Sequence, residues 1–160
     1  MAKRKSISVW IVLKDGKNKG KIALQRRSPR DISFHYIYQA TWSGKGEVGE
    51  SVMDAVKREC KEELGQNFYE NFNFLKLKLV LKEKFIWENT DEIWDRYNYT
   101  YEINETRLNT AKLHDGAFDK FTFVEKETLF YPINSKKNPK NNIVLFNDQY
   151  KILNKLLNAA

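Results

Sequence analysis

Cysteine is almost absent from this chain, since Cys60 is the single one among 160 residues. One cysteine excludes an internal disulfide and a cysteine-rich zinc site, and it makes a reducing cytoplasm the expected compartment. Long apolar runs are also missing, because none approaches the roughly 20 residues that a membrane-spanning helix needs. The apolar stretch at residues 9–13 follows a basic start but is too short for a secretory signal peptide. No membrane segment is expected.

A lysine-containing phosphate loop of the GxxxxGK[ST] type is absent too, which argues against a P-loop nucleotide site. Acidic residues are in deficit, with 28 Lys and Arg against 21 Asp and Glu and a net charge of +7. Such a balance is found in nucleic-acid-binding proteins. The lysines are scattered, however, and a basic surface also steers small polyanions such as nucleotides into a cleft. We therefore do not expect nucleic acid as a partner.

The length fits one domain, residues 1–160, and the order of the expected elements is that of an α+β protein. Alternation of apolar and polar residues predicts the strands. In one of them, four leucines from Leu75 to Leu81 alternate with other residues, mostly lysines, as in a strand with one buried face. The expected strands are 6–14, 21–26, 39–43, 75–87, 97–103 and 120–124, and the expected helices are 52–64 and 143–158. A turn is expected at 89–92. Residues 28–38 look like a loop, and residues 104–118 look irregular or briefly helical.

The most informative stretch is residues 44–66, where a glycine-containing loop runs into an acidic helix. Ser51 followed by Asp54 has the form of a capping box, in which the serine accepts hydrogen bonds from first-turn amides. Gly65, directly after Leu64, is the expected helix stop. These signals predict a helix over 52–64.

Three glutamates of this helix, Glu59, Glu62 and Glu63, lie three and four residues apart and converge on one side. On a helical wheel Glu63 falls inside the apolar arc that also holds Cys60, and Glu59 lies at its edge. Converging carboxylates repel one another unless a cation lies among them, and oxygen ligands suit magnesium or manganese. The alternative is an acidic surface helix held by pairs such as Arg58–Glu62. The glycines in front of the helix favour the metal site.

The spacing of this stretch resembles the signature of the Nudix hydrolase superfamily. The signature is a glycine, five residues, a glutamate, seven residues, and then Arg-Glu-apolar-any-Glu-Glu-any-Gly-apolar. The matching positions are Gly44, Glu50, Arg58, Glu59, Glu62, Glu63 and Gly65. Two positions depart from the pattern, since Cys60 serves as the apolar residue and Gln66 stands where an apolar residue usually follows the glycine. The resemblance covers 23 of 160 residues.

The resemblance implies an α/β/α sandwich in which a mixed sheet lies between helices, with the signature forming a loop–helix–loop beside the sheet. It also implies a divalent cation, Mg²⁺ or Mn²⁺. Glu59 and Glu63 would be the principal metal ligands, with Glu62 and the Gly44 carbonyl in support. Arg58 would orient a glutamate by ion pairing, and Glu50 would hold the arginine or the metal.

The general base in this family often comes from a carboxylate on a later loop. Asp119 is the expected residue, Asp115 and His114 are its rivals, and Glu62 or Glu59 would act if none of them does. Arg26 and Arg27 are candidate phosphate ligands, because a guanidinium presents a planar fork to oxyanions. Aromatic residues could stack on a base; the candidates are Trp42, Tyr36, Tyr38, Trp87 and Tyr99.

The leading hypothesis is a metal-dependent pyrophosphohydrolase that cleaves a nucleoside diphosphate linked to another group X. Its substrates would include (oxidised) nucleoside triphosphates, and its products a nucleoside monophosphate with pyrophosphate or phosphate-X. An isopentenyl-diphosphate-isomerase-like enzyme is an alternative, but it needs a catalytic cysteine before the signature. A non-catalytic nucleotide- or RNA-sensing module is another, although such modules can lose the carboxylates that are present here. A homodimer through the aromatic hairpin at 85–103 is left open.

Overall fold

The computed structural model describes residues 4–30, 34–86, 91–114 and 117–159. The strands in these residues are β1 (Arg4–Leu13), β2 (Ile22–Arg27), β3 (Tyr38–Gln39), β4 (Trp42–Lys45), β5 (Lys78–Ile86), β6 (Ile93–Ile103), β7 (Phe118–Val124), β8 (Tyr131–Pro132) and β9 (Val144–Leu145). The α-helices are α1 (Val52–Leu64), α2 (Gln66–Glu70), α3 (Glu105–Leu108) and α4 (Asn147–Asn158), and short 3₁₀ turns lie at Phe74–Lys76 and Ile133–Ser135.

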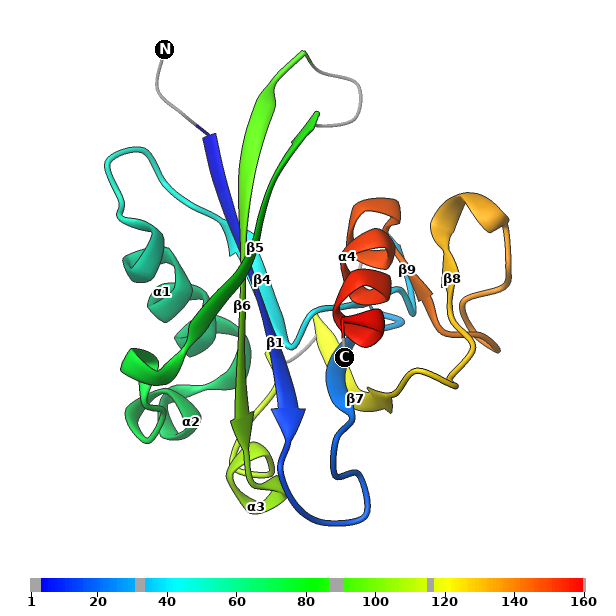
Figure 1. Ribbon diagram of the computed structural model, residues 1–160, viewed down its shortest axis with the longest axis horizontal. Coiled ribbons are helices and arrows are strands. Elements are labelled where there is room, and N and C mark those ends of the chain that lie inside the picture. The colour runs from blue at the N-terminus through cyan, green and yellow to red at the C-terminus, as the bar shows by residue number, and fades with distance from the viewer. Residues whose placement is uncertain (1–3, 31–33, 87–90, 115–116, 160) are drawn as a thin grey trace.

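The strands form one mixed sheet in the order β5-β6-β1-β2-β3-β9-β8, with β4 paired to β1 and β7 paired to β2. β1 runs parallel to β6 and antiparallel to β2 and β4. Figure 1 shows α1 and α2 on one side of the strands and α4 on the other. The expected α+β architecture with a mixed sheet between helices is therefore confirmed.

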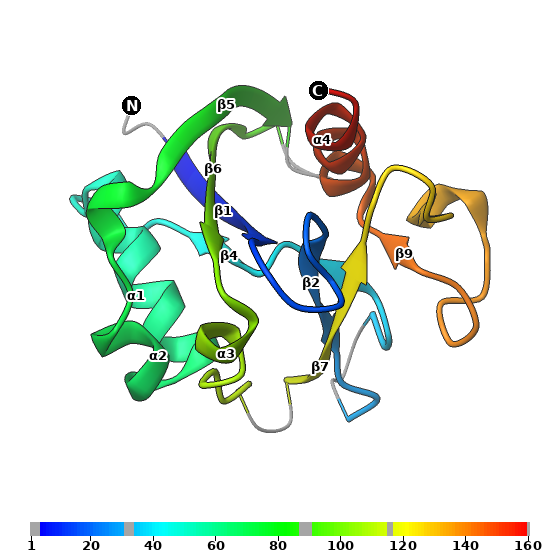
Figure 2. The ribbon, with the colours of Figure 1, turned by 60° about the horizontal axis from the view of Figure 1, so that its bottom comes forward.

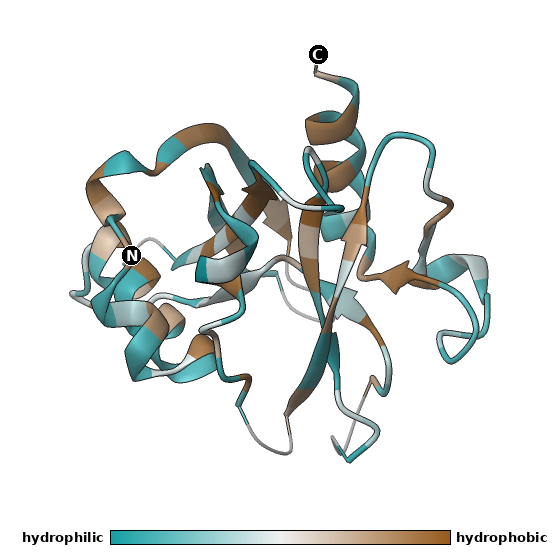
Figure 3. Cartoon of the chain, turned by 90° about the horizontal axis from the view of Figure 1, so that it is seen from below, coloured by the Kyte–Doolittle hydropathy of each residue, from teal (hydrophilic) through white to brown (hydrophobic). Residues whose placement is uncertain are grey.

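Each face of the sheet has its own core, because successive side chains of a strand point to opposite faces. On β1, Val9 and Ile11 pack with α1, whereas Trp10 packs with α4. Figure 3 shows apolar residues concentrated along the strands and polar residues over the loops and outer helix faces. No helix in the described part of the chain is long and apolar enough to cross a membrane.

Helix α1 has the predicted bounds and caps. The Ser51 hydroxyl accepts a hydrogen bond from the Asp54 amide at 3.1 Å, and Gly65 ends the helix with a φ of 88°. Such a positive φ costs glycine little and other residues more. The departure from the signature at Gln66 has a simple basis, because Gln66 begins α2 on the surface and Phe68, two residues later, is the one that is buried.

The expected strand at 75–87 is wrong in its first part and in its buried face. Residues 74–76 form a 3₁₀ turn in which Leu75 is 96% exposed, and β5 starts at Lys78. A bulge between Leu79 and Leu81 then breaks the alternation, and Leu79 is 51% exposed. β5 lies at the edge of the sheet, where bulges are common.

Other differences are smaller. The C-terminal helix begins at Asn147, because residues 144–145 form β9 beside β3. The segment 104–118 holds α3, as its brief helical pattern allowed. Of the expected turn at 89–92, residues 89–90 lie outside the described residues.

Candidate active site

The loop before α1 is fixed to β1 through its backbone. Gly44 is paired with Ile7 in the β4–β1 ladder, and the amide of Gly46 donates to the Lys5 carbonyl at 2.8 Å. The Lys5 ammonium in turn donates to the Glu50 carbonyl at 3.2 Å. The start of α1 is thereby held against the edge of the sheet.

Arg58 is the centre of an ion-pair network on α1. Its Nε and Nη2 donate to the two carboxylate oxygens of Glu50 at 2.8 and 3.1 Å, and its Nη1 donates to Glu59 at 2.8 Å. Nη2 also donates to the Lys45 carbonyl at 2.8 Å. The hydrogen bond from Arg58 lowers the pKa of Glu50, and the Glu50 carboxylate raises the pKa of Arg58. The arginine therefore ties the loop to the helix and orients the Glu59 carboxylate.

Glu63 is buried against the sheet, as the helical wheel predicts, with 6% of its surface exposed. Its Oε1 accepts a hydrogen bond from the side-chain amide of Gln25 on β2 and another from the Ser43 amide at 3.4 Å. Burial, with the neighbouring Glu59 carboxyl as a second cause, raises the pKa of Glu63 well above its ordinary value.

The carboxyl groups of Glu59 and Glu63 are neighbours, and each affects the pKa of the other. Burial also raises the pKa of Glu59, although the neighbouring Glu63 carboxyl and the charge of Arg58 act in the opposite direction. Two carboxyls in contact are tolerated when they share a proton or a cation. This pair is therefore the part of α1 where a cation would relieve the largest electrostatic cost.

Glu62 differs from the other two glutamates. Its side chain is 55% exposed, and its contacts with Arg58 are long, at 3.5 Å. It lies one residue from the buried pair but on the solvent side. Its carboxylate is consequently accessible to accept a proton.

Gly44 leaves the space that the Glu59 carboxylate occupies. A Cβ built on Gly44 would overlap that carboxylate, with Glu59 Oε2 only 2.6 Å away. We expect Gly44→Ala to displace Glu59 and to lower Mn²⁺ affinity and kcat by about tenfold or more, as changes around metal ligands do. Isothermal titration with Mn²⁺ and steady-state kinetics measure both.

Gly46→Ala is the matched control in the same loop. A Cβ there would meet its nearest neighbour, the Lys5 carbonyl oxygen, at 3.4 Å, an ordinary contact distance. This variant should keep Mn²⁺ affinity within about twofold of the wild type. If both alanine variants behaved alike, Gly44 would have no special role.

Arg26 and Asp119, for which the sequence suggested separate roles, are paired with each other. Arg26 Nε donates to Asp119 Oδ1 at 2.9 Å and Nη2 donates to Oδ2 at 2.5 Å. The guanidinium also lies over the Tyr36 ring, 4.9 Å from its centroid. This hydrogen-bonded pairing raises the pKa of Arg26. Within the described residues, neither side chain forms a hydrogen bond or an ion pair with the glutamates of α1.

A bulge in β7 explains this pairing. Lys120 is opposite Arg26 and Phe118 is opposite Arg27, so Asp119 is the extra residue of the bulge. Strand alternation puts Gln25 and Arg27 on the face of α1 and Arg26 on the other face. Arg27 accordingly contacts Gln39 at 3.5 Å, on the side of the sheet where Glu63 lies.

The buried position of Trp42 does not support the expectation that its ring stacks on a substrate. It is completely buried, its indole N–H donates to the Val56 carbonyl at 3.0 Å, and its ring packs edge-on against Phe68 and Phe72. The reason is its place at the start of β4, directly beneath α1. It is a core residue.

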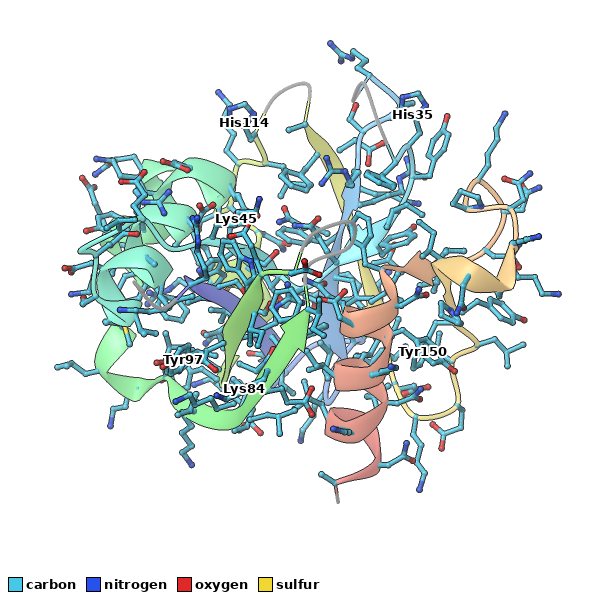
Figure 4. All side chains as sticks on the ribbon, turned by 90° about the horizontal axis from the view of Figure 1, so that it is seen from above. His35, Lys45, Lys84, Tyr97, His114 and Tyr150 are labelled. Carbon is cyan, nitrogen blue, oxygen red and sulfur yellow. The ribbon has the colours of Figure 1, made fainter. Side chains whose placement is uncertain are left out.

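The remaining candidate residues for base stacking and for the general base differ in their burial. Tyr38 is buried and Tyr99 is partly buried against the core, whereas Trp87 and Asp115 lie outside the described residues. His114 is exposed, and Figure 4 shows its ring at the outer edge of the molecule. Its backbone amide nevertheless donates to the Glu63 carbonyl at 3.2 Å.

A pocket of about 460 Å³ lies between the loop that holds Ala111 and Leu113 and strand β7. The loop that forms one wall is held to α1 by hydrogen bonds from the amides of Lys112 and His114 to the carbonyls of Leu64 and Glu63. β7 forms another wall, and Figure 2 shows it beside β2. The lining residues are Ser28, Arg30, Ala111, Leu113, Phe118, Asp119, Lys120 and Phe121. The pocket thus offers aromatic rings, a hydroxyl, a carboxylate and two cations.

A model of the NUDIX domain matches residues 4–149. The chain belongs to the Nudix family. The signature carboxylates of this Nudix domain, Glu59, Glu62 and Glu63, are in place on α1. A comparison with curated protein sequences finds no significant match.

Three solved structures illustrate the fold. A MutT/Nudix family protein from Enterococcus faecalis has a TM-score of 0.63 at 15% identity, over 97% of this chain and 61% of that protein. The Nudix domain of Shewanella oneidensis NrtR, solved with ADP ribose, has a TM-score of 0.59 at 11% identity, over 98% of this chain and 87% of that one. A Francisella tularensis bifunctional NMN adenylyltransferase/ADP ribose pyrophosphatase, solved with AMP and a Mn ion, has a TM-score of 0.58 at 15% identity. The match covers 98% of this chain and 42% of that protein. This Nudix chain therefore spans less than two thirds of the first and third proteins.

The residues of the signature fit a hard divalent cation, although they form no complete cage. Among the described residues, no group of three or more His, Cys, Asp or Glu is close enough to hold a metal. The neighbouring carboxyl groups of Glu59 and Glu63 offer oxygen donors, as Mg²⁺ and Mn²⁺ prefer. Beside it, the buried Oε1 of Gln25 has no hydrogen-bond partner, and such an acceptor suits the waters that magnesium retains.

Sequence reasoning missed Gln25, Ser43 and Gln39, which surround Glu63 on the side of the sheet. They are 38, 20 and 24 residues away from Glu63 in sequence, so no local pattern connects them to it. The one available signal was polar residues in otherwise apolar strands, since Gln25 and Gln39 are both buried.

Proposed function

We propose that this Nudix-family chain is a metal-dependent pyrophosphohydrolase that cleaves a nucleoside diphosphate linked to another group. The observation that carries the proposal is the pair of neighbouring carboxyl groups of Glu59 and Glu63, held by Arg58 from one side and by the sheet from the other. Glu59 and Glu63 would hold Mg²⁺ or Mn²⁺, with Glu62 and the Gly44 carbonyl in support. When bound, the cation supplies charge neutralisation for the phosphate oxygens and makes the attacking water more acidic.

Arginine side chains have two further roles at the proposed site. Arg58 keeps Glu59 in place and ties the loop to the helix through Glu50. Arg27 is the better placed of the two arginines to contact a phosphate, because it lies on the same face of β2 as Gln25, the face on which Glu63 lies. A guanidinium fork at that position would stabilise the negative charge that develops on the leaving phosphate.

We assign the general base to Glu62. It is solvent-exposed and weakly paired, whereas Asp119 is held in a bidentate ion pair. A positioned carboxylate that accepts the proton of the attacking water contributes about 10²–10⁴-fold to the rate. Asp119 remains the second candidate, because it also lines the pocket.

The pocket beside β7 is proposed to hold the nucleoside part of the substrate. Phe118 and Phe121 offer rings on which a base can stack, and Ser28 and Asp119 offer hydrogen-bonding partners. The similarity to Nudix structures solved with ADP ribose and with AMP supports a nucleotide substrate. Nucleoside triphosphates, including oxidised ones, and nucleoside diphosphates linked to a sugar are both within the proposed class.

A substrate screen with phosphate detection tests the proposal. The panel comprises nucleoside triphosphates, an 8-oxo derivative, ADP-ribose, a dinucleoside polyphosphate and a nucleotide sugar, each with Mg²⁺ or Mn²⁺ and with EDTA. We expect a nucleoside monophosphate from at least one of them, with the rate abolished by EDTA. Absence of turnover across the panel, or turnover that survives EDTA, would contradict the proposal.

Of the alternatives, the isomerase-like enzyme finds no support, because Cys60 is buried in the core and burial raises the pKa of its thiol. The sensing module differs from the proposed hydrolase in turnover alone, which the same panel measures. A single domain, a cytoplasmic location and a homodimer through residues 85–103 stay predictions. Gel filtration with light scattering measures the last of these.

A further inference from the structure

Gln25 is a polar residue in the middle of a buried strand. Its side chain is completely buried on β2, between Ala23, which lies in the core under α1, and Arg27. Burial of an amide is costly unless its groups are hydrogen-bonded. The side-chain amide of Gln25 donates to Glu63, whereas its carbonyl oxygen has no partner. A residue kept here at such a cost calls for a role beyond packing.

The hydrogen bonds to Glu63 come from one side only. Gln25 and the Ser43 amide both donate to Oε1 of Glu63, and neither donates to Oε2. Ser43 is itself held by Gln39, whose amide donates to the serine hydroxyl at 3.0 Å. This arrangement fixes the rotation of the Glu63 carboxylate and leaves its second oxygen for Glu59 or a cation.

We propose that Gln25 is a positioning residue, which orients the Glu63 carboxylate for a divalent cation and presents its own buried carbonyl oxygen to the hydration shell of that ion. The inference rests on the proposed function, since it concerns the same metal site. Partners that orient metal ligands in this way commonly change metal affinity or activity by about 10–100-fold when they are removed.

Gln25→Met tests the proposal, because it keeps the length of the side chain and removes both hydrogen-bonding groups. Gln149→Met is the matched control. Gln149 is also buried, and its Oε1 accepts a hydrogen bond from the Ala40 amide at 2.8 Å, but it lies on α4 across the sheet. Mn²⁺ binding is measured by electron paramagnetic resonance on the whole protein without substrate, and Tm is measured for each variant.

We expect Gln25→Met to raise the Kd for Mn²⁺ by about tenfold or more and Gln149→Met to leave it within about twofold of the wild type, even where both lower Tm. If Gln25→Met does not fold, Gln25→Asn replaces it. The shortened amide does not reach Glu63, and we expect the same loss of affinity.

An unchanged Mn²⁺ affinity in a folded Gln25 variant would overturn the inference while the proposed function stands. An equal loss in Gln149→Met would also overturn it, since that result indicates a general packing effect. A wild-type protein that binds no Mn²⁺ would overturn the metal assignment and this inference together.

Discussion

Replacing Glu63 with glutamine is expected to lower kcat by about 10³-fold, because removal of a principal metal ligand forfeits several kcal/mol of transition-state stabilisation. Glutamine retains an oxygen that can accept the hydrogen bonds from Gln25 and Ser43. The variant should therefore fold normally. Kinetics at saturating Mg²⁺, compared with Mn²⁺ binding in the absence of substrate, measure the effect.

The same substitution should stabilise the metal-free protein. Glu63 is buried beside Glu59, and an uncharged amide removes both the burial of a charge and the contact between two acids. A gain of about 1–3 kcal/mol in the free energy of unfolding is the usual size of such a relief. For a chain of this size it raises Tm by about 2–4 °C per kcal/mol. Loss of activity with a gain in stability is the pattern of a residue retained for its function.

The stability of the metal-free protein should also depend on pH. The pKa of Glu63 in the folded state is raised above its ordinary value of 4.5. A carboxyl of this kind stabilises the fold fully below its unfolded pKa, and that contribution is lost as the pH rises through the folded pKa. Tm in EDTA should thus fall as the pH rises above the ordinary pKa of 4.5, and it should fall less in Glu63→Gln. If Tm fell equally with pH in both proteins, the pH dependence of stability could not be assigned to Glu63.

Glu62→Gln is expected to lower kcat by about 10²–10³-fold, the contribution of a general base. The Kd for Mn²⁺ should change by only about threefold, since Glu62 lies outside the buried pair. Asp119→Asn is the comparison, and it should lower kcat by less than about tenfold, because Asp119 is engaged with Arg26. Steady-state kinetics at saturating metal separate the two residues.

If Asp119→Asn lowered kcat more than Glu62→Gln did, Asp119 would be the general base. In that case Arg26→Ala, which frees the aspartate, should alter the pH dependence of kcat. Equal and small effects of Glu62→Gln and Asp119→Asn would leave neither residue as the base, and the assignment of Glu62 would be wrong.

Helix α1 could be predicted from sequence signals that lie within the helix and at its two ends. Its first and last residues follow from Ser51 and Gly65, and the burial of Glu63 follows from the 3.6-residue period. The spacing of the signature led to the family for the same reason, since all of its residues lie within one loop and one helix. These parts of the site are local in sequence.

The other half of the site is not local. Gln25 reaches Glu63 only because β2 is placed in the sheet next to β3 and β7. The choice between Arg26 and Arg27 depends on strand alternation, and the pairing of Arg26 depends on a bulge at Asp119 that no residue pattern marks. Trp42 shows the same limit, because a tryptophan on a short strand has the same local pattern whether it faces a core or a substrate.

The central claim is that the pair Glu59–Glu63 exists to bind a divalent cation. Anomalous diffraction at the manganese edge from crystals grown with Mn²⁺ tests it most directly. We expect an anomalous peak within coordination distance of carboxylate oxygens of both glutamates, with the two carboxylates no longer in direct contact. A peak elsewhere, with the two carboxyl groups still in contact with each other, or no peak at all, would contradict it.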